Sequence, residues 1–584
     1  DLELLAGFVD RDTLQRALDH ATACAVLESD GGRWRFRHDK LREHLLAQLS
    51  DERRKQLHRE LGEILRAQHG ESDSQIQALA HHFRESGLLA DEARCSGLAG
   101  EQALANGAYG DAARLLARAI ELRGHVDFER VVMVRWHRKL GEAHYVMGDL
   151  SRAVGELSGA VRELGRPLPG SRVGWAFLLL RLVLVHVFLL ALPGRFVARR
   201  RERCAELLEG ARAAGRLANL STYSGDVLRI FACSLLSANL AERAGRPSAY
   251  SLAVMGYSAS YMGLRRLADR YFARASAAAL AQDDPTALVE ATQMECAYRL
   301  GAGEFARCKE LLESGYAAAE RADYQLGLAL AEGFIGQCEY FLGNFAAMLA
   351  HYARARELLT LRSPEHEHSF ACGEAHALCM LGRFEEGERV LARAAAGVGA
   401  EYLLGEAFVL ATRCFVRAWS GGDALAAGLA TNAYVRGHAI AIPPPCAHVL
   451  TAPAEAFIAA ARGSGGDAAL DAAREHAVVL RSWSRRNPVG EASSLLFDGQ
   501  LRALQGDVPA AIDACERALV SAKRLGLRFC QAQAELELGR LRGPASVPGR
   551  GHLERARDLA TRCGAAHHGA VVDALLDHDD DDAG

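Results

Sequence analysis

Several features that would indicate an enzyme or a secreted protein are missing from this sequence. None of its 14 cysteines forms a CxxC pair, and such scattered cysteines are typical of reduced thiols in a cytosol. No GxxxxGK[ST] loop occurs, and the five lysines lie in no kinase or ATPase motif. A net charge of −4 over 584 residues excludes strong bulk attraction to nucleic acid or anionic membrane. We therefore expect a non-enzymatic, cytoplasmic chain with no cofactor of its own.

The chain also lacks an initiating methionine. It begins at Asp1, and no charged-then-apolar signal segment precedes the first predicted helix. We expect it to begin within a longer protein. Arginine far outnumbers lysine, and alanine and glycine are abundant, which is typical of a GC-rich bacterial gene.

The sequence is rich in one pattern, a repeat of about forty residues. In LGEAHYVMGDLSRAVGELSGA, Gly141, Gly148, Ala153 and Ala160 stand at offsets 0, 7, 12 and 19, and four other segments follow the same frame. The steps from Gly263 are 40, 40, 39 and 39 residues. The turn glycines of the series are Gly107, Gly148, Gly263, Gly303, Gly343, Gly382, Gly421 and Gly506.

This spacing predicts helical hairpins. Small residues allow two antiparallel helices to approach closely, and the middle glycine ends the first helix in a left-handed conformation. The pattern resembles the tetratricopeptide repeat, which implies an all-α fold, a tetratricopeptide-like α-α superhelix, over residues 92–577. The gap between Gly148 and Gly263 has room for three further steps, with Gly194 as one turn. A weak unit is expected near ARGSGGDAALDAAREHA.

An apolar run, VGWAFLLLRLVLVHVFLLAL at residues 173–192, approaches the length of a membrane span. Arginines follow it, as a positive flank would: Arg195, Arg199, Arg200, Arg201 and Arg203. A single span would place similar repeats on opposite sides of a bilayer. We therefore favour a buried or groove-covering helix over membrane contact, which remains the alternative.

A different pattern precedes the repeats. DRDTLQRALDHATA predicts a helix that Asp10 or Asp12 can cap, and CAVLES and RWRFRH predict two strands joined by DGG. Trp34, Phe36 and His38 share one strand face. Asp39 is placed to cap the next helix, KLREHLLAQL. Helix, hairpin and helix together outline a small N-terminal winged-helix module over residues 1–68, followed by a connecting helix at residues 69–91.

FRHDKLREHL followed by RRKQLHRELGEIL resembles the winged-helix end of signal-transduction ATPases with numerous domains (STAND ATPases). The resemblance implies that His38 senses the β-phosphate of ADP held by an upstream module and that Asp39 is its neighbouring helix cap. Arg37 stands where the family often has methionine, and the alternative is a strand-end histidine that packs beside Trp34. The stretch SANLAERAGRPSAYSLAVMGYSASYMGLRRLADRYFARA resembles bacterial proteins that join such an ATPase to a serine/threonine kinase or nucleotide cyclase.

Two other constellations are weaker. Cys372, His376 and Cys379 stand at i, i+4 and i+7 on one helix face, which a soft metal ion could bridge. The same face packs in a repeat, so we expect no metal there and keep the three as a weak candidate. The end of the chain, residues 578–584, is expected to be a disordered acidic tail.

These patterns predict a regulatory arm of a multidomain signalling ATPase. A protein or small-molecule inducer would bind in the superhelical groove and control an upstream nucleotide-binding domain of the same polypeptide, which would hold the ADP or ATP. The alternatives are a free-standing tetratricopeptide-like scaffold for protein–protein interaction and a winged-helix transcriptional regulator. Asp12 and Asp19, on the outer side of the first helix, would repel DNA phosphates, so no specific nucleic acid is expected.

Overall fold

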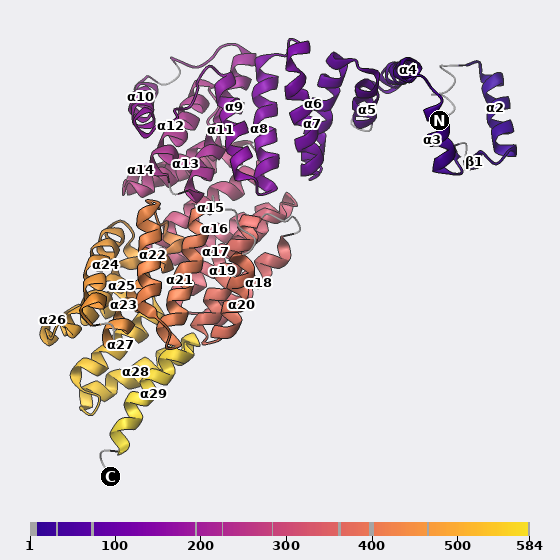
Figure 1. Ribbon diagram of the computed structural model, residues 1–584. Coiled ribbons are helices and arrows are strands. Elements are labelled where there is room, and N and C mark those ends of the chain that lie inside the picture. Colours follow the sequence, from indigo (N-terminus) through magenta and orange to yellow (C-terminus); the bar gives the residue numbers. More distant parts are fainter. Residues whose placement is uncertain are drawn as a thin grey trace. The chain divides into compact units, whose positions relative to one another are not determined.

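The computed structural model describes residues 9–30, 33–71, 75–192, 195–224, 226–282, 284–359, 364–395, 402–463 and 466–581. Within these residues the chain is helical apart from one two-stranded sheet. The chain divides into two compact units, residues 1–166 and residues 167–584. Each unit is a stack of helical hairpins, so the predicted all-α, tetratricopeptide-like fold class is confirmed (Figure 1).

The first unit begins with a helix and a strand pair and continues as helices. Its elements are α2 (Arg11–Ala23), β1 (Leu27–Asp30), β2 (Arg33–Phe36), α3 (Asp39–Ala47), α4 (Asp51–His69), α5 (Ile76–Ser86), α6 (Leu89–Ala105), α7 (Tyr109–Glu121), the 3-10 turn η1 (Leu122–His125), α8 (Arg130–Val146) and α9 (Leu150–Glu163).

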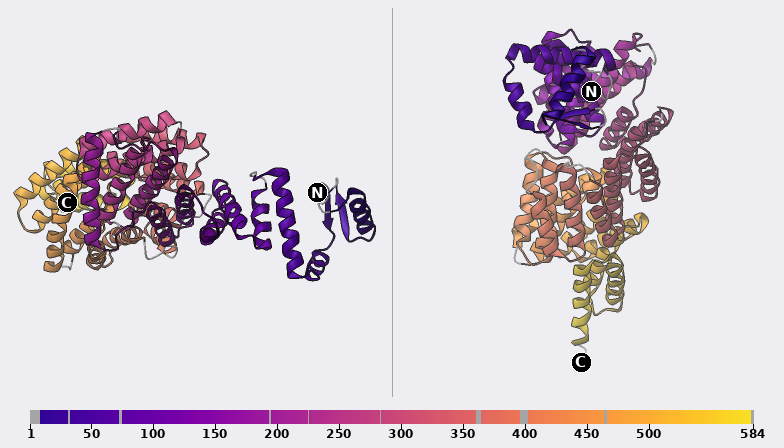
Figure 2. Two further views of the ribbon diagram at one scale, coloured as in Figure 1. Left: turned by 90° about the horizontal axis from the view of Figure 1, so that it is seen from above. Right: turned by 90° about the vertical axis from the view of Figure 1, so that its right-hand side faces the viewer.

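The N-terminal elements follow the predicted order without a packed winged-helix core. Asp10 caps α2, accepting a 3.0 Å hydrogen bond from the Thr13 amide. The strands β1 and β2 pair antiparallel, with Leu27 opposite Phe36. However, α2 buries only Leu18, and α3 buries none of its residues. The views in Figure 2 place this hairpin and α2 at one end of the first unit. The described residues therefore have the predicted order of helix, hairpin and helix, but these elements do not pack into a common core.

The helix expected to be a connector is part of the stack. The apolar face of α5, with Leu79 and Phe83 fully buried, packs against Leu65 of α4 and Cys95 of α6. It can do so because apolar residues recur on α5 with helical spacing. Hairpin packing thus begins at α4, ahead of the predicted boundary at residue 92.

The small residues of the repeat frame work as predicted. A Cβ atom on Gly141 would lie 2.7 Å from the Leu157 Cγ atom, so only glycine allows α8 and α9 to approach this closely. Ala153 and Ala160 on the facing helix are fully buried. All eight predicted turn glycines have φ between +73° and +82°, the left-handed conformation in which glycine ends a helix.

The second unit consists of one single helix followed by helical hairpins and a final helix. Its helices are α10 (Arg172–Ala191), α11 (Arg201–Tyr223), α12 (Val227–Arg243), α13 (Ala249–Tyr261), α14 (Arg265–Gln282), α15 (Pro285–Ala302), α16 (Phe305–Arg321), α17 (Gln325–Leu342), α18 (Phe345–Leu358), α19 (Pro364–Met380), α20 (Phe384–Ala395), α21 (Leu403–Trp419), α22 (Ala424–Gly437), α23 (His448–Arg462), α24 (Gly466–Arg486), α25 (Glu491–Leu504), α26 (Val508–Leu525), α27 (Arg528–Arg542), α28 (Val547–Cys563) and α29 (Ala566–Asp581), with 3-10 turns η2 (Pro444–Cys446) and η3 (Pro488–Gly490).

Two expectations for the second unit need correction. Three steps between Gly148 and Gly263 would place two hairpin turns in the gap, but it holds the single helix α10 and one hairpin, α11 with α12, and Gly194 lies outside the described residues. The weak unit near residue 461 is the hairpin of α23 and α24. At the other end, α29 continues to Asp581, into the expected disordered tail, because Val572 and Leu576 pack that helix into a core with Leu536 and Leu553.

The apolar helix α10 was predicted to be buried or to cover a groove, and the first of these alternatives is wrong because most of the helix is exposed. It is the one helix of the described chain that is long and apolar enough to cross a membrane, and only 17% of its apolar window, Arg172–Leu189, is buried. Three of its residues, Trp175, Leu182 and His186, are buried. The His186 imidazole lies 2.7 Å from both Asn239 of α12 and Tyr271 of α14. One side of α10 is thus held to the stack, and the rest is exposed.

Candidate functional site

The first helices of successive hairpins in the second unit line a cavity of about 150 Å³. Glu455 and Arg462 lie two turns apart on α23, and Gln533, Glu537 and Arg540 lie at i, i+4 and i+7 on α27. This helical spacing places each set on one face. Residues of α21, α25 and α29 complete the wall, among them Trp419, Gln500 and His567.

Two arginines of this cavity share one carboxylate. Arg462 Nη2 donates to Glu537 Oε2 at 2.6 Å, and Arg540 Nη1 donates to Glu537 Oε1 at 2.8 Å. The Glu537 side chain is buried, whereas both arginines are about one-third exposed. Burial lowers the pKa of Arg540 from its ordinary value. The arginines are therefore anchored by Glu537 and remain partly open to the cavity.

The other acidic group of the cavity is not firmly ionised. Burial raises the pKa of Glu455 to about 7, and its Oε1 atom accepts a 2.5 Å hydrogen bond from Gln533 Nε2. His568 is neutral because burial lowers its pKa to about 3. His567 stacks on Trp419, with ring centroids 5.4 Å apart. The cavity thus places the two guanidinium groups of Arg462 and Arg540 around the single carboxylate of Glu537, a combination that suits an acidic ligand.

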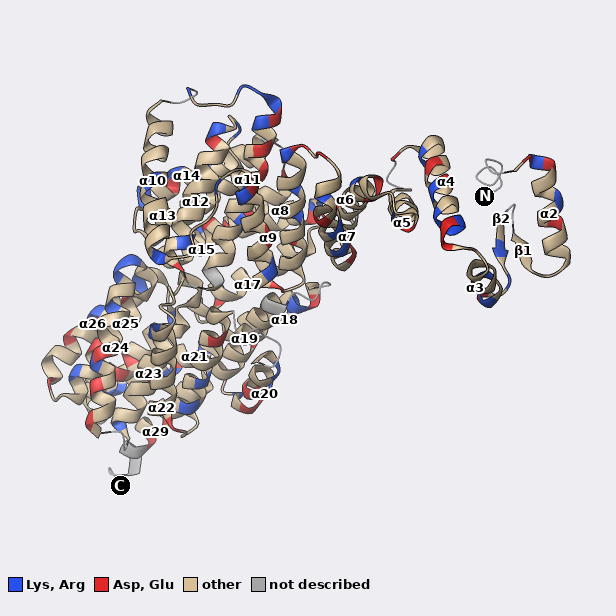
Figure 3. Cartoon of the chain, turned by 45° about the horizontal axis from the view of Figure 1, so that its top comes forward, with Lys and Arg blue, Asp and Glu red and all other residues tan. Residues whose placement is uncertain are grey.

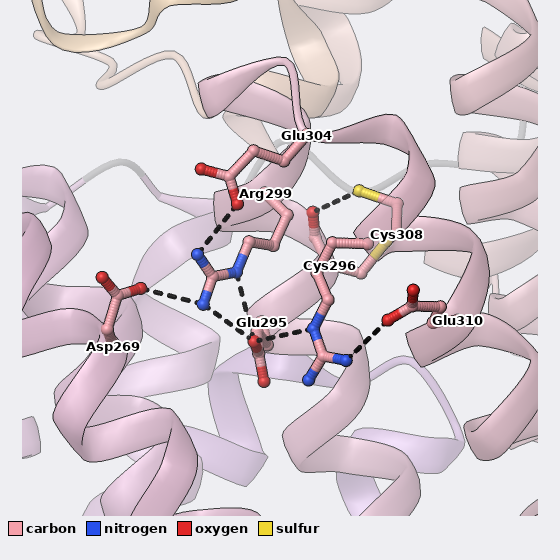
Figure 4. Close-up of polar contacts among 8 residues, drawn as sticks. Asp269, Glu295, Cys296, Arg299, Glu304, Cys308 and Glu310 are labelled. Atoms are coloured by element: carbon pink, nitrogen blue, oxygen red, sulfur yellow. Dashed lines mark hydrogen bonds and ion pairs between the residues drawn. The ribbon is translucent and has the colours of Figure 1, made fainter.

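Another charged network is already balanced. Arg299 of α15 lies 2.8 Å from Asp269 of α14, 3.0 Å from Glu295 and 2.9 Å from Glu304, which precedes α16 (Figure 4). Glu295 also lies 3.8 Å from Arg307. Because every charge in this network has an opposite partner, it ties α14, α15 and α16 together, and we assign it a structural role.

Three thiols lie beside this network. Cys296, Cys308 and Cys338 have their sulfur atoms within 4.8 Å of one another. Cys308 donates a weak hydrogen bond of 3.7 Å to the Cys296 carbonyl, which Figure 4 shows. Cys296 and Cys308 occupy small-residue positions of the repeat frame and are fully buried among apolar side chains. Burial raises the pKa of the Cys296 thiol, which disfavours the thiolate that a metal requires. We therefore assign these cysteines to packing.

The predicted nucleotide-sensing residues lie on the surface of the first unit. His38 precedes α3 in an extended conformation and makes no side-chain cap bond. The sequence predicted Asp39 as the helix cap. In the structure Asp39 is the first residue of the helix, and its carboxylate lies 3.6 Å from Arg42. The cap position is taken by His38, which has the extended conformation of a cap residue, so the helix begins at Asp39 itself.

The weak metal candidates on α19 are directed to different neighbours. Cys372 Sγ lies 3.5 Å from His368 Nε2. His376 stacks on Phe415 with ring centroids 5.2 Å apart. Cys379 is buried where the chain of Gly387 approaches α19. In the described part of the chain, metal-ligand spacing is found instead at the three cysteines above and at His58, His81 and His82.

The sequence did not point to the cavity of the second unit. Trp419 and His567 are far apart in the chain, and only the stacking of five helices brings them together. One local feature hinted at the site. Glu537 and Arg540 are charged residues on α27, and residues 532–539 of this helix, Glu537 included, are all buried.

No protein-family model and no curated protein matches the sequence. Among solved structures, the chain is similar to a chain of the crystal structure of the APC/C hetero-tetramer Cut9–Hcn1, with 12% identity, a TM-score of 0.41, and coverage of 99% of this chain and 98% of that one. For yeast Tom70 the identity is 13%, the TM-score 0.31, and the coverage 82% and 95%. For the human IFIT1 dimer with m7Gppp-AAAA, the values are 15%, 0.32, 77% and 95%.

Proposed function

We propose that the second unit is a protein-interaction scaffold whose cavity binds an acidic segment of a partner protein. The observation that carries this proposal is the pairing of Arg462 and Arg540 with the single buried carboxylate of Glu537. A carboxylate of the partner would be a second acceptor for two guanidinium groups that are already oriented. Trp419 and its stacked neighbour His567 would contact the apolar part of such a segment.

The test is a selection of displayed peptides on the immobilised full chain. We expect enrichment of peptides with aspartate or glutamate beside an apolar residue, and loss of their binding to the Arg462→Ala/Arg540→Ala variant. Arg517→Ala is the matched control, because Arg517 pairs with Asp513 on the exposed surface of α26 at 3.4 Å. Enrichment of peptides without acidic residues would contradict the proposal, and so would equal binding of the selected peptides to the wild-type chain and the cavity variant.

The scaffold would act as a regulatory arm if the chain continues into a nucleotide module. In that arrangement residues 1–68 would complete the upstream ATPase module, and His38 would contact ADP. The proposal is supported by the exposure of His38 at the junction between β2 and α3. In a parent protein with a P-loop, His38→Ala should release ADP faster, whereas exposed His44→Ala should not. Equal ADP release would rule out the sensing role and leave the free-standing scaffold.

A further inference from the structure

Three imidazoles form a compact group on two helices of the first unit. His58 lies on α4, and His81 and His82 are adjacent on α5. Their ring centroids are 5.6, 5.2 and 5.4 Å apart, and one nitrogen of each ring lies within 4.8 Å of the others. His58 Nδ1 and His82 Nδ1 share a hydrogen bond of 2.9 Å. The group is thus a nearly equilateral triangle of rings.

This triangle has the dimensions of a three-histidine metal site. With metal–nitrogen distances of about 2.0–2.1 Å and tetrahedral angles, ligand nitrogens stand about 3.3 Å apart and ring centroids about 5 Å apart. The observed centroid distances of 5.2 to 5.6 Å are close to this value, and small rotations of the rings would bring one nitrogen of each ring to the ligand spacing. The two most buried rings, His58 and His82, are held by α4 and α5, which pack together around Leu65 and Phe83.

An ion can reach this group of rings from solvent. His81 is exposed, and it borders a cavity of about 550 Å³, so an ion can enter and keep water as a fourth ligand.

We propose that His58, His81 and His82 bind a borderline divalent transition-metal ion such as Zn²⁺ with an open coordination position. Imidazole ligands favour zinc, copper and nickel over calcium or magnesium. A bound ion would replace the hydrogen bond between His58 of α4 and His82 of α5 with coordination by both helices. The site is independent of the cavity in the second unit, since it lies within the first.

The experiment is titration of the metal-free full chain with Zn²⁺ by calorimetry and with Co²⁺ by visible absorption. We expect one site with the nitrogen-ligand spectrum of Co²⁺. His58→Gln and exposed His81→Gln should each weaken binding by more than the roughly 10–100-fold that loss of a supporting second-shell group costs. His69→Gln, an exposed change on the same helix α4, should have no effect.

Three results would overturn the proposal: no binding to the wild-type chain, equal binding to His81→Gln, or an intense thiolate band with Co²⁺, which would place the ion at cysteines. Because His81 is exposed, His81→Gln keeps the test valid even if His58→Gln fails to fold.

A separate observation concerns the exposed face of α10. Val173, Phe177, Leu180, Leu184 and Val187 recur at intervals of four and three residues and form one exposed stripe. Phe177 is 71% exposed, and Phe188 beside the stripe is 62% exposed. The core helix of a soluble protein can be equally long and apolar, but such a helix is mostly buried, whereas only 17% of the apolar window of α10 is buried.

Charge at both ends of α10 indicates what covers this stripe. Arg172 precedes it, Arg181 stands on its border, and exposed arginines follow it at positions 195, 199, 200 and 201. Figure 3 shows α10 almost free of charged residues, with basic residues in the segment that leads into α11. Anionic lipid headgroups complement these arginines while acyl chains accept the apolar stripe. His186 ties the opposite face of α10 to Asn239, so the helix would lie on a membrane surface and not cross it.

We infer that α10 binds the surface of an anionic membrane. The full chain should float with vesicles of phosphatidylcholine and phosphatidylglycerol in equal parts, and not with phosphatidylcholine alone. Phe177→Ser/Leu184→Ser/Phe188→Ser should abolish flotation, whereas Val520→Ser at an equally exposed valine of α26 should preserve it. Failure of the wild-type chain to float, or flotation of the triple variant, would overturn the inference. A dimer that forms without lipid and dissociates in the triple variant would also overturn it, by identifying a second copy as the occupant.

Discussion

The indole ring of Trp136 lies so close to Gly97 that a Cβ atom at position 97 would stand 1.9 Å from the Cζ2 atom of the ring. Trp136 is buried, and its Nε1 atom donates a hydrogen bond of 3.0 Å to Glu101. Gly97 belongs to α6 and Trp136 to α8. The missing side chain at position 97 therefore allows two successive hairpins to meet.

Adding one methyl group at Gly97 should destabilise the first unit. Because the ring cannot move away without losing its hydrogen bond, Gly97→Ala should cost about 2–3 kcal/mol of unfolding free energy. Gly155→Ala is the matched control on α9, where nothing lies within 4 Å of the new Cβ atom, and it should be neutral or stabilise by up to about 1 kcal/mol. Denaturant unfolding compares the two, and equal effects would contradict this packing.

The second unit should be sensitive to acid. Burial lowers the pKa values of His366, His448 and His476 to about 4. The folded state then binds fewer protons than the unfolded state, so the stabilisation is complete above the ordinary pKa near 6.5 and is lost as pH falls toward 4. Between pH 7 and pH 5 each such histidine should lower the free energy of unfolding by about 2 kcal/mol.

The change that tests this acid sensitivity is His448→Phe, which keeps an aromatic ring beside Phe408. Its Tm should fall less between pH 7 and pH 5 than that of the wild-type chain, measured by calorimetry. Exposed His44→Gln should leave the slope unchanged. Parallel pH slopes for the wild-type and His448→Phe chains would show that His448 is not buried as a neutral group.

Glu455 should give the opposite pH dependence. Burial raises its pKa to about 7. Its contribution to the free energy of unfolding is therefore complete below about pH 4.5 and is lost as pH rises through about 7. Glu455→Gln, which cannot ionise, should therefore gain stability relative to wild type between pH 5 and pH 8, by up to about 3 kcal/mol. A difference in Tm that does not change with pH would show that Glu455 is ionised throughout.

Removing Arg299 should be costly because it leaves a buried carboxylate. The Glu295 side chain is only 5% exposed, and loss of one partner from a buried ion pair costs about 3–5 kcal/mol. Arg299→Ala should approach this range in unfolding free energy. Arg517→Ala breaks an exposed pair and should cost less than about 1 kcal/mol. Similar values for the two variants would mean that Glu295 finds other partners, such as Arg307.

Much of the hairpin architecture was predictable because glycine and alanine have local consequences. Gly141, Gly148 and Ala153 specify a close helix pair and a left-handed turn regardless of distant contacts. The eight turn glycines therefore all occupy their predicted positions. The position of α10 was not predictable, since a helix that is apolar on all sides does not reveal which side packs.

The cavity of the second unit and the histidine group of the first could not be predicted from the sequence, for a different reason. Glu455 and Glu537 resemble ordinary helix-surface residues until stacking brings α23 and α27 together and excludes water from both. His81 and His82 are adjacent in the sequence, but His58 joins them only through the packing of α4 against α5. Periodicity predicts which face of a helix is apolar, and not which polar residues of different helices will meet.

Hydrogen-exchange mass spectrometry of the full chain with a selected acidic peptide tests the proposed function most directly. The peptide should slow exchange at the C-terminal halves of α23 and α27 and at the start of α29, where Arg462, Arg540 and His567 lie. The Arg462→Ala/Arg540→Ala variant should show no such slowing. Protection confined to other helices, or retained in that variant, would contradict binding in the cavity.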